Sequence, residues 1–204
     1  MPKRFGNSAV FITGASAGIG AALAKAFAKE GAKVALAARR AEKLNGVVNA
    51  IQLEGGTAIS VVCDVTDRAS IDAAVARTVE NFGRIDVAVA NAGFGVSGPF
   101  QRIETDDYRR QFDTNVFGAI DTAKAVLPHL LESCGRLGLV SSVLGRIPSP
   151  AYSAYTASKY AVCGFADSIY YELAPLGVSV TSIEPGLIES DFRNIGFSLF
   201  EPQN

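Results

Sequence analysis

The sequence predicts a single α/β domain with a doubly wound parallel sheet between two layers of helices. Short apolar runs rich in β-branched residues alternate with longer amphipathic runs along the 204 residues. The short runs are apolar on both faces, which is typical of strands in a covered parallel sheet. No linker, repeat or low-complexity segment interrupts this alternation, so we expect one domain spanning residues 1–204.

The individual elements follow from this alternation in chain order. The expected strands are Ala9–Thr13, Lys33–Ala38, Ala58–Cys63, Asp86–Ala90, Arg136–Ser141 and Val178–Ile183. The expected helices are Ile19–Glu30, Ala41–Leu53, Ser70–Phe82, Asp106–Leu131 (with a break) and Ala154–Leu173. Right-handed crossovers between at least six strands favour a three-layer α/β/α Rossmann fold.

Capping residues mark several helix ends. Gly31, Gly83 and Gly177 follow expected helices, where a residue in the left-handed conformation commonly closes a helix. Ser70 is a good N-cap residue, and we expect it to cap the helix that it begins.

Composition and charge exclude several classes of partner. The formal net charge is −1, without a block of like charges, so we expect neither nucleic acid nor an anionic membrane as a partner. No apolar run approaches the ~18 residues of a membrane span, and the apolar stretch after residues 1–6 is too short for a signal peptide. These observations predict a cytoplasmic protein.

The cysteines and the single histidine predict no metal site. Cys63, Cys134 and Cys163 are widely spaced, without a Cys-x-x-Cys pair, and are expected to be buried free thiols. His129 stands in an expected helix with no Asp or Cys at metal-ligand spacing, so we expect a structural role. A Ser-His-Asp hydrolase would have to be built on this one histidine.

A glycine-rich segment joins the first expected strand to the first expected helix. It reads TGASAGIG from Thr13 to Gly20. Glycines here allow a tight turn and a close approach to a pyrophosphate, whose charge the helix N-terminus stabilises. A plain tight turn is the alternative, and the strand–loop–helix context favours the dinucleotide. The candidate binding residues are Gly14, Ser16, Ala17, Gly18, Ile19 and Gly20.

The Gly-x-x-x-Gly-x-Gly spacing of this loop resembles that of the short-chain dehydrogenase/reductase family. Further motifs in the family's order extend the resemblance from Ala9 to about Phe192. It implies an oxidoreductase that uses a nicotinamide cofactor.

The end of the second expected strand favours NADP(H) over NAD(H). An acidic residue at this point binds the ribose 2′-hydroxyl of NAD, whereas an arginine suits the 2′-phosphate of NADP. The strand ends without an acid at Ala38, and Arg39 and Arg40 follow. The planar guanidinium can bind a phosphate through two hydrogen bonds. The alternative is that both arginines merely begin a solvated helix.

Two motifs after the third and fourth strands extend the resemblance. It implies that Asp64 binds the adenine amino group and that Val65 packs beside the ring; an ordinary helix-capping role for Asp64 is the alternative. Asn91, Ala92 and Gly93 resemble the family's Asn-Ala-Gly signature. For Asn91 this leaves two roles open, one in holding the central sheet and one in contacting the cofactor.

A tyrosine and a lysine four residues apart are the candidate catalytic pair. On a helix, Tyr155 and Lys159 project from the same face. A nearby ammonium favours phenolate, so we expect Lys159 to lower the pKa of Tyr155 from about 10 and to suit it to acid–base chemistry. The resemblance implies that Lys159 also holds the nicotinamide ribose. It selects Ser142 to bind the substrate carbonyl oxygen, with Ser141 as a strand-end backbone partner.

The resemblance implies further site residues. Asn115 would break its helix and hold a water molecule that relays protons to Lys159. A Pro-Gly motif after the last strand would flank the nicotinamide, and Ser190 is the nearest equivalent of a threonine that binds the carboxamide. The expected cofactor-binding residues of this segment are Pro185, Gly186, Ile188 and Ser190.

These observations predict an NADP(H)-dependent enzyme that interconverts a carbonyl compound and an alcohol, with Tyr155 as general acid and base. The expected pocket residues are mainly apolar, which favours a substrate with an apolar or aromatic body: Phe94, Val143, Leu144, Ile147, Pro148, Tyr152 and Leu187. The long helices within residues 106–131 and 154–173 are expected to pair in a homodimer or homotetramer.

Two other functions stay open at this point. One is an NADP-binding sensor or interaction protein with weak catalysis. It is suggested by the short segment after Gly186, which offers no candidate for the final strand of the family, so that the substrate lid is expected to be missing. The other is a sugar-nucleotide epimerase or dehydratase, which shares Tyr-x-x-x-Lys but usually has another glycine spacing.

Overall fold

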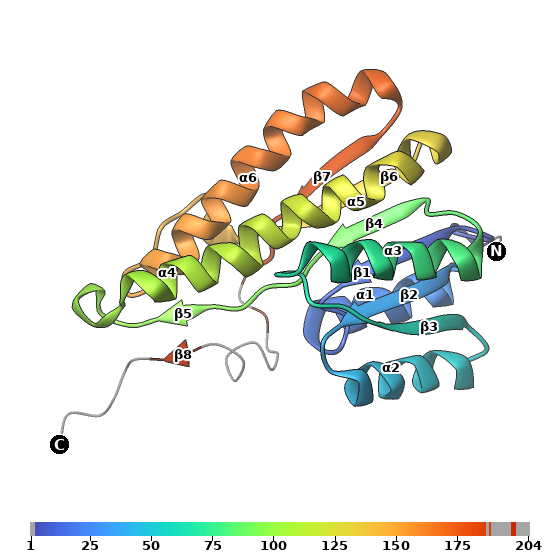
Figure 1. Cartoon of the computed structure of the whole chain (residues 1–204), viewed down its shortest axis with the longest axis horizontal. Helices are drawn as coiled ribbons and strands as arrows, with labels where there is room; N and C mark the ends of the chain where they lie inside the picture. The colour runs from blue at the N-terminus through green and yellow to red at the C-terminus, as the bar shows by residue number, and fades with distance from the viewer. Residues whose placement is uncertain (1–2, 187, 189–196, 199–204) are drawn as a thin grey trace.

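A computed structural model describes residues 3–186, 188 and 197–198 and confirms the predicted fold class. Six parallel strands form one sheet in the order β3-β2-β1-β4-β6-β7 (Figure 1). Their bounds are β1 Ala9–Thr13, β2 Lys33–Ala38, β3 Thr57–Val62, β4 Val87–Ala90, β6 Arg136–Val140 and β7 Ser179–Ile183. The direction of strand order reverses between β1 and β4, which is the ligand-binding switch point of doubly wound sheets.

Helices cover both faces of the sheet (Figure 1). One face packs on α1 and α2, and the other packs on α3, α5 and α6. The helices are α1 Gly18–Lys29, α2 Ala41–Leu53, α3 Arg68–Phe82, α4 Thr105–Phe112, α5 Gly118–Ser133 and α6 Ser153–Leu173. Short turns of other helix types are η1 Phe100–Arg102, η2 Asp113–Phe117, η3 Val143–Gly145 and η4 Ala174–Leu176.

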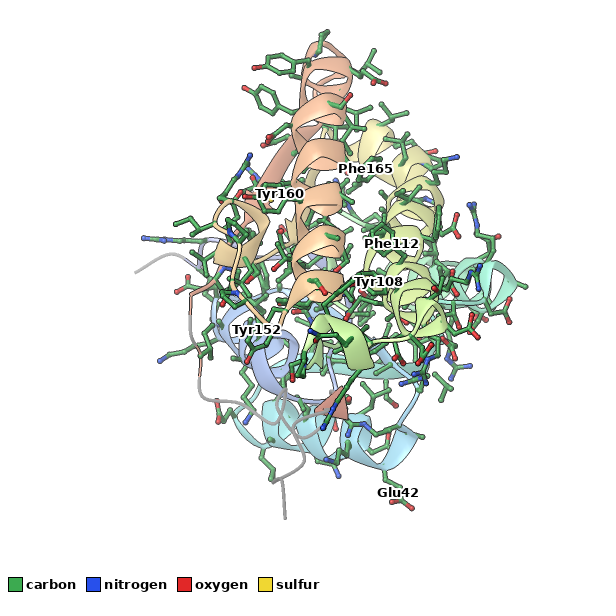
Figure 2. All side chains as sticks on the ribbon, turned by 90° about the vertical axis from the view of Figure 1, so that its left-hand side faces the viewer. Glu42, Tyr108, Phe112, Tyr152, Tyr160 and Phe165 are labelled. Carbon is green, nitrogen blue, oxygen red and sulfur yellow. The ribbon has the colours of Figure 1, made fainter. Side chains whose placement is uncertain are left out.

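The core lies on both sides of the central strands because successive strand side chains point to opposite faces. In β1, Phe11 packs with the cluster under α3, α5 and α6, whereas Val10 and Ile12 pack with the cluster under α1 and α2. Phe112 and Phe165 pack against the first of these clusters, on the flank of α6 that faces α4 and α5 (Figure 2). Burial of both faces explains the continuous apolar strands seen in the sequence.

The predicted helix-capping residues are confirmed except for one. Gly31, Gly83 and Gly177 have φ angles of 92°, 80° and 82° and adopt the expected left-handed conformation. The expectation for Ser70 is wrong, because α3 begins at Arg68 and the Asp67 side chain accepts a hydrogen bond from the Ala69 N–H at 2.9 Å. The Ser70 hydroxyl instead accepts the backbone N–H of Asp64 at 3.0 Å, which ties the end of β3 to α3.

The break expected within residues 106–131 is a π-helical turn, Asp113–Phe117, between α4 and α5. Such turns are often found at functional sites because they re-aim side chains within a continuous helix. The turn places Asn115 in the interior, where 2% of its surface is exposed.

Two features differ from expectation. A second, two-stranded parallel sheet pairs β5, Val96–Ser97, with β8, Phe197–Ser198, a pairing between segments a hundred residues apart that local patterns do not reveal. Cys63 and Cys163 are buried free thiols as expected, but Cys134 is exposed. It ends α5 in the left-handed conformation, with φ 46° and ψ 49°, so its side chain lies outside the core.

Candidate active site

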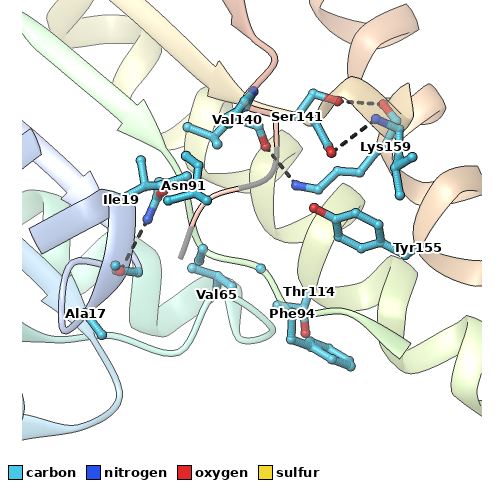
Figure 3. Close-up of a pocket in the computed structure, with 18 of the residues that line it drawn as sticks. Ala17, Ile19, Val65, Asn91, Phe94, Thr114, Val140, Ser141, Tyr155 and Lys159 are labelled. Carbon is cyan, nitrogen blue, oxygen red and sulfur yellow. Dashed lines mark hydrogen bonds between the residues drawn. The ribbon is translucent and has the colours of Figure 1, made fainter. Parts of the chain in front are cut away.

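A cavity of about 720 Å³ opens at the carboxyl ends of the parallel strands. Residues that follow each strand of the main sheet line it, so the topology itself brings together segments from residues 14 to 188. Figure 3 shows this pocket, with Ala17 and Ile19 on one side and Tyr155 and Lys159 on the other.

The glycine-rich loop packs closely against the loop that follows β4. A Cβ atom on Gly14, whose φ is +67°, would lie 2.7 Å from the Cα of Ala92. A Cβ on Gly20 would lie 2.6 Å from the side chain of Asn91, so Gly20 serves this packing and is absent from the pocket lining. Ala17 caps α1 without a side-chain hydrogen bond, which leaves the N–H groups of the first turn available to an anion.

Asn91 connects β4 to the glycine-rich loop. Its Nδ2 donates to the carbonyl oxygens of Thr13 at 2.9 Å and Gly14 at 3.3 Å. The Thr13 hydroxyl in turn accepts the N–H groups of Asn91 and Ala92 at 3.0 and 3.1 Å. Asn91 therefore holds the sheet at the switch point, and it also lines the pocket with Ala92 and Gly93, so both expected roles are compatible with its position.

The two arginines after β2 line the same pocket. Arg40 Nη2 donates to the Ser16 hydroxyl at 3.0 Å, which places its guanidinium beside the glycine-rich loop. Ala38 is buried and offers no acid at the end of the strand. The pocket wall near α1 and α2 thus carries positive charge at its rim.

Asp64 and Val65 line the pocket as expected. The Asp64 carboxylate accepts the backbone N–H of Thr66 at 3.0 Å and its hydroxyl at 2.8 Å. Burial acts to raise the pKa of Asp64, but these hydrogen bonds and the charge of Arg39 lower it overall. Since Asp67 caps α3, the alternative role of Asp64 as a helix cap is wrong.

Ser142, Tyr155 and Lys159 meet at the other end of the cavity (Figure 3 labels Tyr155 and Lys159). Tyr155 and Lys159 project from the same face of α6, and the ammonium Nζ lies 5.6 Å from the centre of the Tyr155 ring. Lys159 Nζ donates to the Val140 carbonyl oxygen at 2.9 Å, at the end of β6. Ser142 directly precedes η3 and caps it, because its hydroxyl accepts the Leu144 N–H at 3.1 Å.

The pKa values of this pair differ from expectation. Burial raises the pKa of Tyr155, and the hydrogen bond with Ser142 opposes this shift only in part. Burial also lowers the pKa of Lys159 to about 8. The expected lowering of the Tyr155 pKa is therefore wrong for the structure as described, because removal of the phenol from water is the largest influence on it.

Asn115 is not among the pocket-lining residues. Its Oδ1 accepts the Phe94 N–H at 3.0 Å, and its Nδ2 donates to the Phe94 carbonyl at 3.0 Å and to the Ser158 hydroxyl at 3.1 Å. These contacts hold the segment after Gly93 against α6. The relay water molecule stays a prediction, since the side chain of Asn115 is largely engaged in this support.

The remaining expected residues follow the last strands. Ser141 is the strand-end partner that was expected: its N–H donates to the Ile183 carbonyl at 2.7 Å, and its hydroxyl donates to the Lys159 carbonyl at 2.9 Å (Figure 3). Pro185, Gly186 and Ile188 line the pocket, whereas Leu187 and Ser190 lie outside the described residues.

Comparison with known proteins identifies the family. A family model described as short chain dehydrogenase matches residues 8–196. The chain belongs to the short-chain dehydrogenase/reductase family. It is therefore an oxidoreductase of a family that uses a nicotinamide cofactor.

Several individual proteins are similar to the chain over most of its length. It is 40% identical over 183 residues to oxidoreductase BOA17 of Botryotinia fuckeliana (strain B05.10), a match that covers 89% of the chain and 66% of that relative's length. An NAD+-bound xylitol dehydrogenase has a TM-score of 0.87 and 34% identity, covering 90% of the chain and 72% of that structure. An alcohol dehydrogenase from Thermococcus sibiricus complexed with 5-hydroxy-NADP has a TM-score of 0.87 and 28% identity, covering 91% and 78%.

The pocket fits the dinucleotide that this family uses. Its volume of about 720 Å³ lies within the range of small-molecule and cofactor sites. One end offers the glycine-rich loop, which has no room for Cβ atoms at Gly14 and Gly20, beside the two arginines. The other end offers two hydroxyl groups and an ammonium group.

Sequence reasoning missed one supporting residue of the site. Gln111 is fully buried in α4, and its side chain accepts the Val96 N–H at 2.8 Å and donates to the Phe94 carbonyl. The sequence shows a glutamine within an expected amphipathic helix, but it does not show that this side chain is buried or which groups it contacts.

Within the described ranges, no helix is long and apolar enough to cross a membrane. Among the same residues, no group of three or more His, Cys, Asp or Glu side chains is placed to hold a metal ion.

Proposed function

We propose that this oxidoreductase interconverts a carbonyl compound and an alcohol, uses NADP(H) in preference to NAD(H), and employs Tyr155 as its general acid and base. The observation that carries this proposal is that the Ser142 and Tyr155 side chains line the same end of the pocket, beside the buried Lys159, whose Nζ lies 5.6 Å from the centre of the Tyr155 ring. Two hydroxyl donors at one point of a pocket suit a carbonyl oxygen, which gains negative charge during reduction.

The dinucleotide would lie across the switch point. The glycine-rich loop and the α1 N-terminus would bind the pyrophosphate, Asp64 and Val65 the adenine, and Pro185, Gly186 and Ile188 the nicotinamide. Lys159 would hold the nicotinamide ribose. When bound, this cofactor supplies or accepts the hydride.

Ser142 and Tyr155 would hold the carbonyl oxygen between their hydroxyl groups. The raised pKa of Tyr155 keeps its hydroxyl protonated at neutral pH, so it can donate a proton to the oxygen as the carbonyl is reduced. The Lys159 ammonium lies close enough to stabilise the phenolate that remains, although its hydrogen bond to Val140 holds it beside the ring. Alcohol oxidation reverses these steps.

Arg39 and Arg40 support the preference for NADP(H). Both line the pocket where the adenosine ribose would lie, and Ala38 provides no carboxylate to bind a 2′-hydroxyl. A guanidinium binds a dianionic phosphate more strongly than a neutral hydroxyl, since charge-assisted hydrogen bonds are about twice as strong as neutral ones.

The substrate would be a small carbonyl compound or alcohol with an apolar or aromatic body. Beyond Ser142, the pocket is lined mostly by apolar side chains, namely Phe94, Val143, Leu144, Ile147, Pro148 and Tyr152. A homodimer or homotetramer is part of the proposal; light scattering of the purified protein tests it, and a monomer at micromolar concentration would contradict it.

Calorimetric titration with NADPH and NADH, followed by turnover of a panel of ketones and aldehydes, tests the proposal. We expect tighter binding of NADPH, a preference lost in Arg39→Asp, and NADPH oxidation that depends on a carbonyl compound. Equal affinity for both cofactors would contradict the cofactor preference.

The role of Tyr155 has its own test. Tyr155→Phe should bind NADPH like the wild type and lose about 10²- to 10⁴-fold in turnover, the usual contribution of acid–base catalysis. Tyr171→Phe, on an exposed position of the same helix, is the matched control and should keep full activity. A near-normal rate in Tyr155→Phe would rule out this assignment.

A further inference from the structure

A second polar cluster lies behind the candidate catalytic residues, outside the pocket lining. It centres on Arg146, which directly follows η3, the short turn that Ser142 caps at its other end. Arg146 Nε and Nη2 donate to Glu184 Oε1 at 3.0 and 2.9 Å. Nη1 and Nη2 donate to the two carboxylate oxygens of Asp167 on α6 at 3.0 and 3.3 Å.

This cluster joins three parts of the site that are far apart in the sequence. Arg146 belongs to the segment that carries Ser142, Asp167 belongs to the helix that carries Tyr155 and Lys159, and Glu184 directly precedes Pro185. The Val143 N–H donates to the Pro185 carbonyl at 2.9 Å, which continues the contact between the two pocket walls. Tyr160, which projects from the flank of α6 opposite Phe165 (Figure 2), donates its hydroxyl to the Arg146 carbonyl.

The space between the cluster and the catalytic residues is tightly packed. Glu184 Oε1 also accepts the Ser182 hydroxyl at 2.9 Å and lies 3.6 Å from the Cys163 sulfur. That sulfur lies 3.1 Å from the Ser141 hydroxyl. A Cβ on Gly145 would lie 2.6 Å from the Ser141 hydroxyl and 2.9 Å from the Lys159 carbonyl, so η3 rests directly on α6. A shift of Arg146 would therefore be transmitted to the segment that holds Ser142.

We propose that Arg146 is a positioning residue. Through its paired contacts with Glu184 and Asp167 it fixes the positions of Ser142, which caps η3, of the Pro185 segment and of the catalytic face of α6 relative to one another. A guanidinium suits this role because its rigid fork can bind two carboxylates in defined directions, which a lysine ammonium cannot do. Arg146 touches neither cofactor nor substrate, since the residues lining the cavity do not include it. The expected effect of Arg146 on kcat rests on the proposed carbonyl–alcohol reaction.

The kinetic test compares Arg146→Met with Arg68→Met. Arg68 is a matched control on α3, because it also contacts two carboxylates, Asp72 and Asp121, and its side chain is 45% exposed against 46% for Arg146. We expect Arg146→Met to lower kcat about 10- to 100-fold, the effect of a small misplacement of catalytic groups, with the Kd for NADPH within about twofold of wild type. Arg68→Met should change neither kcat nor the Kd for NADPH.

Two further variants distinguish positioning from general stabilisation. Arg146→Lys keeps the charge without the fork and should restore only part of kcat. Glu184→Gln affects one of the two paired contacts and should lower kcat less than Arg146→Met does. The double variant should be no slower than Arg146→Met, because that change already removes the contact with Glu184. A kcat equal to wild type in Arg146→Met, or a loss reproduced by Arg68→Met, would overturn the proposal. If Arg146→Met does not fold, Glu184→Gln and Arg146→Lys carry the test.

Hydrogen exchange of the cofactor-free protein provides a readout that needs no activity. The amides of Ser141 and Val143 donate to the Ile183 and Pro185 carbonyls. In Arg146→Met these amides should exchange at least about 10-fold faster than in the wild type, whereas in Arg68→Met their exchange rates should equal those of the wild type. If the wild type turned over no carbonyl compound while these amides exchanged faster in the variant, the proposed function would fail and the positioning link would stand. Unchanged exchange would refute the link whatever the activity.

Discussion

Arg40 and Ser16 join two segments of the candidate cofactor site through a hydrogen bond of 3.0 Å from Nη2 to the serine hydroxyl. The arginine follows β2, and the serine lies in the glycine-rich loop after β1. Since β1 and β2 are adjacent parallel strands, their following loops meet at one edge of the sheet. The contact holds a guanidinium where the ribose phosphate of NADP would bind in the proposed function.

Arg40→Gln tests this relationship. We expect the Kd for NADPH to rise about 10- to 100-fold, since hydrogen bonds to charged groups contribute about 1.5–3 kcal/mol. The Kd for NADH, which lacks the 2′-phosphate, should change little and serves as the internal control. Calorimetry measures both values, and equal weakening of the two cofactors would show that Arg40 does not recognise the phosphate.

The buried Lys159 should make stability depend on pH. Burial lowers its pKa from 10.5 to about 8, so between these values the unfolded chain binds a proton that the folded chain does not. The free energy of unfolding contributed by this group therefore rises as pH increases through this window. The rise is at most about 3 kcal/mol, because one pKa unit corresponds to about 1.4 kcal/mol.

Comparison with Lys159→Met isolates this contribution. Burial raises the pKa of Cys63 from 9.0 to about 11, which acts in the opposite direction over part of the window but is common to both proteins. Chemical denaturation of the cofactor-free proteins between pH 7 and 10 should show the wild type gaining stability relative to the variant. If the free energies of unfolding of the two proteins changed in parallel with pH, the pKa of Lys159 in the folded protein would be that of a solvated lysine.

Asn115 should contribute strongly to stability. Asn115→Ala removes partners of the Phe94 amide and the Ser158 hydroxyl in the interior, where each unsatisfied polar group costs about 1–3 kcal/mol. We expect a loss of about 3 kcal/mol in urea denaturation. Asn81→Ala removes an exposed hydrogen bond to the Arg77 carbonyl on α3 and should cost less than about 0.5 kcal/mol. Similar losses in the two variants would contradict a supporting role for Asn115.

Cys134→Gly should stabilise the protein. Cys134 adopts φ 46° and ψ 49° at the end of α5, a conformation that costs an L-residue about 1–2 kcal/mol. Glycine removes this cost but gains flexibility in the unfolded chain, so we expect a net gain of about 0.5 kcal/mol and a Tm about 1–2 °C higher. Cys134→Ala keeps the backbone cost and is the control. Equal Tm values for the glycine and alanine variants would show that no strain is relieved.

Local patterns in the sequence account for most of the elements. The alternation of apolar and amphipathic runs located all six strands of the main sheet and its long helices, with shifts of one or two residues at their ends. Such patterns succeed because burial of a helix stripe or of two strand faces requires apolar residues at regular spacing. The prediction of Ser70 as the N-cap of α3 is wrong because Asp67 and Ser70 are both good capping residues, and local sequence does not distinguish them. In the structure Asp67 caps α3, and the Ser70 hydroxyl accepts the Asp64 N–H.

The sequence by itself determined the fold class, the glycine-rich loop and, through the family resemblance, most of the candidate residues that line the pocket. Tertiary structure decided the burial, the long-range contacts and the pKa shifts of these residues. The raised pKa of Tyr155 follows from burial, and the link from Arg146 to Glu184 joins residues 38 positions apart. The pairing of β5 with β8 likewise joins distant segments. Conformational preferences act over a few neighbouring residues, whereas desolvation and long-range contacts arise only once the elements have packed together.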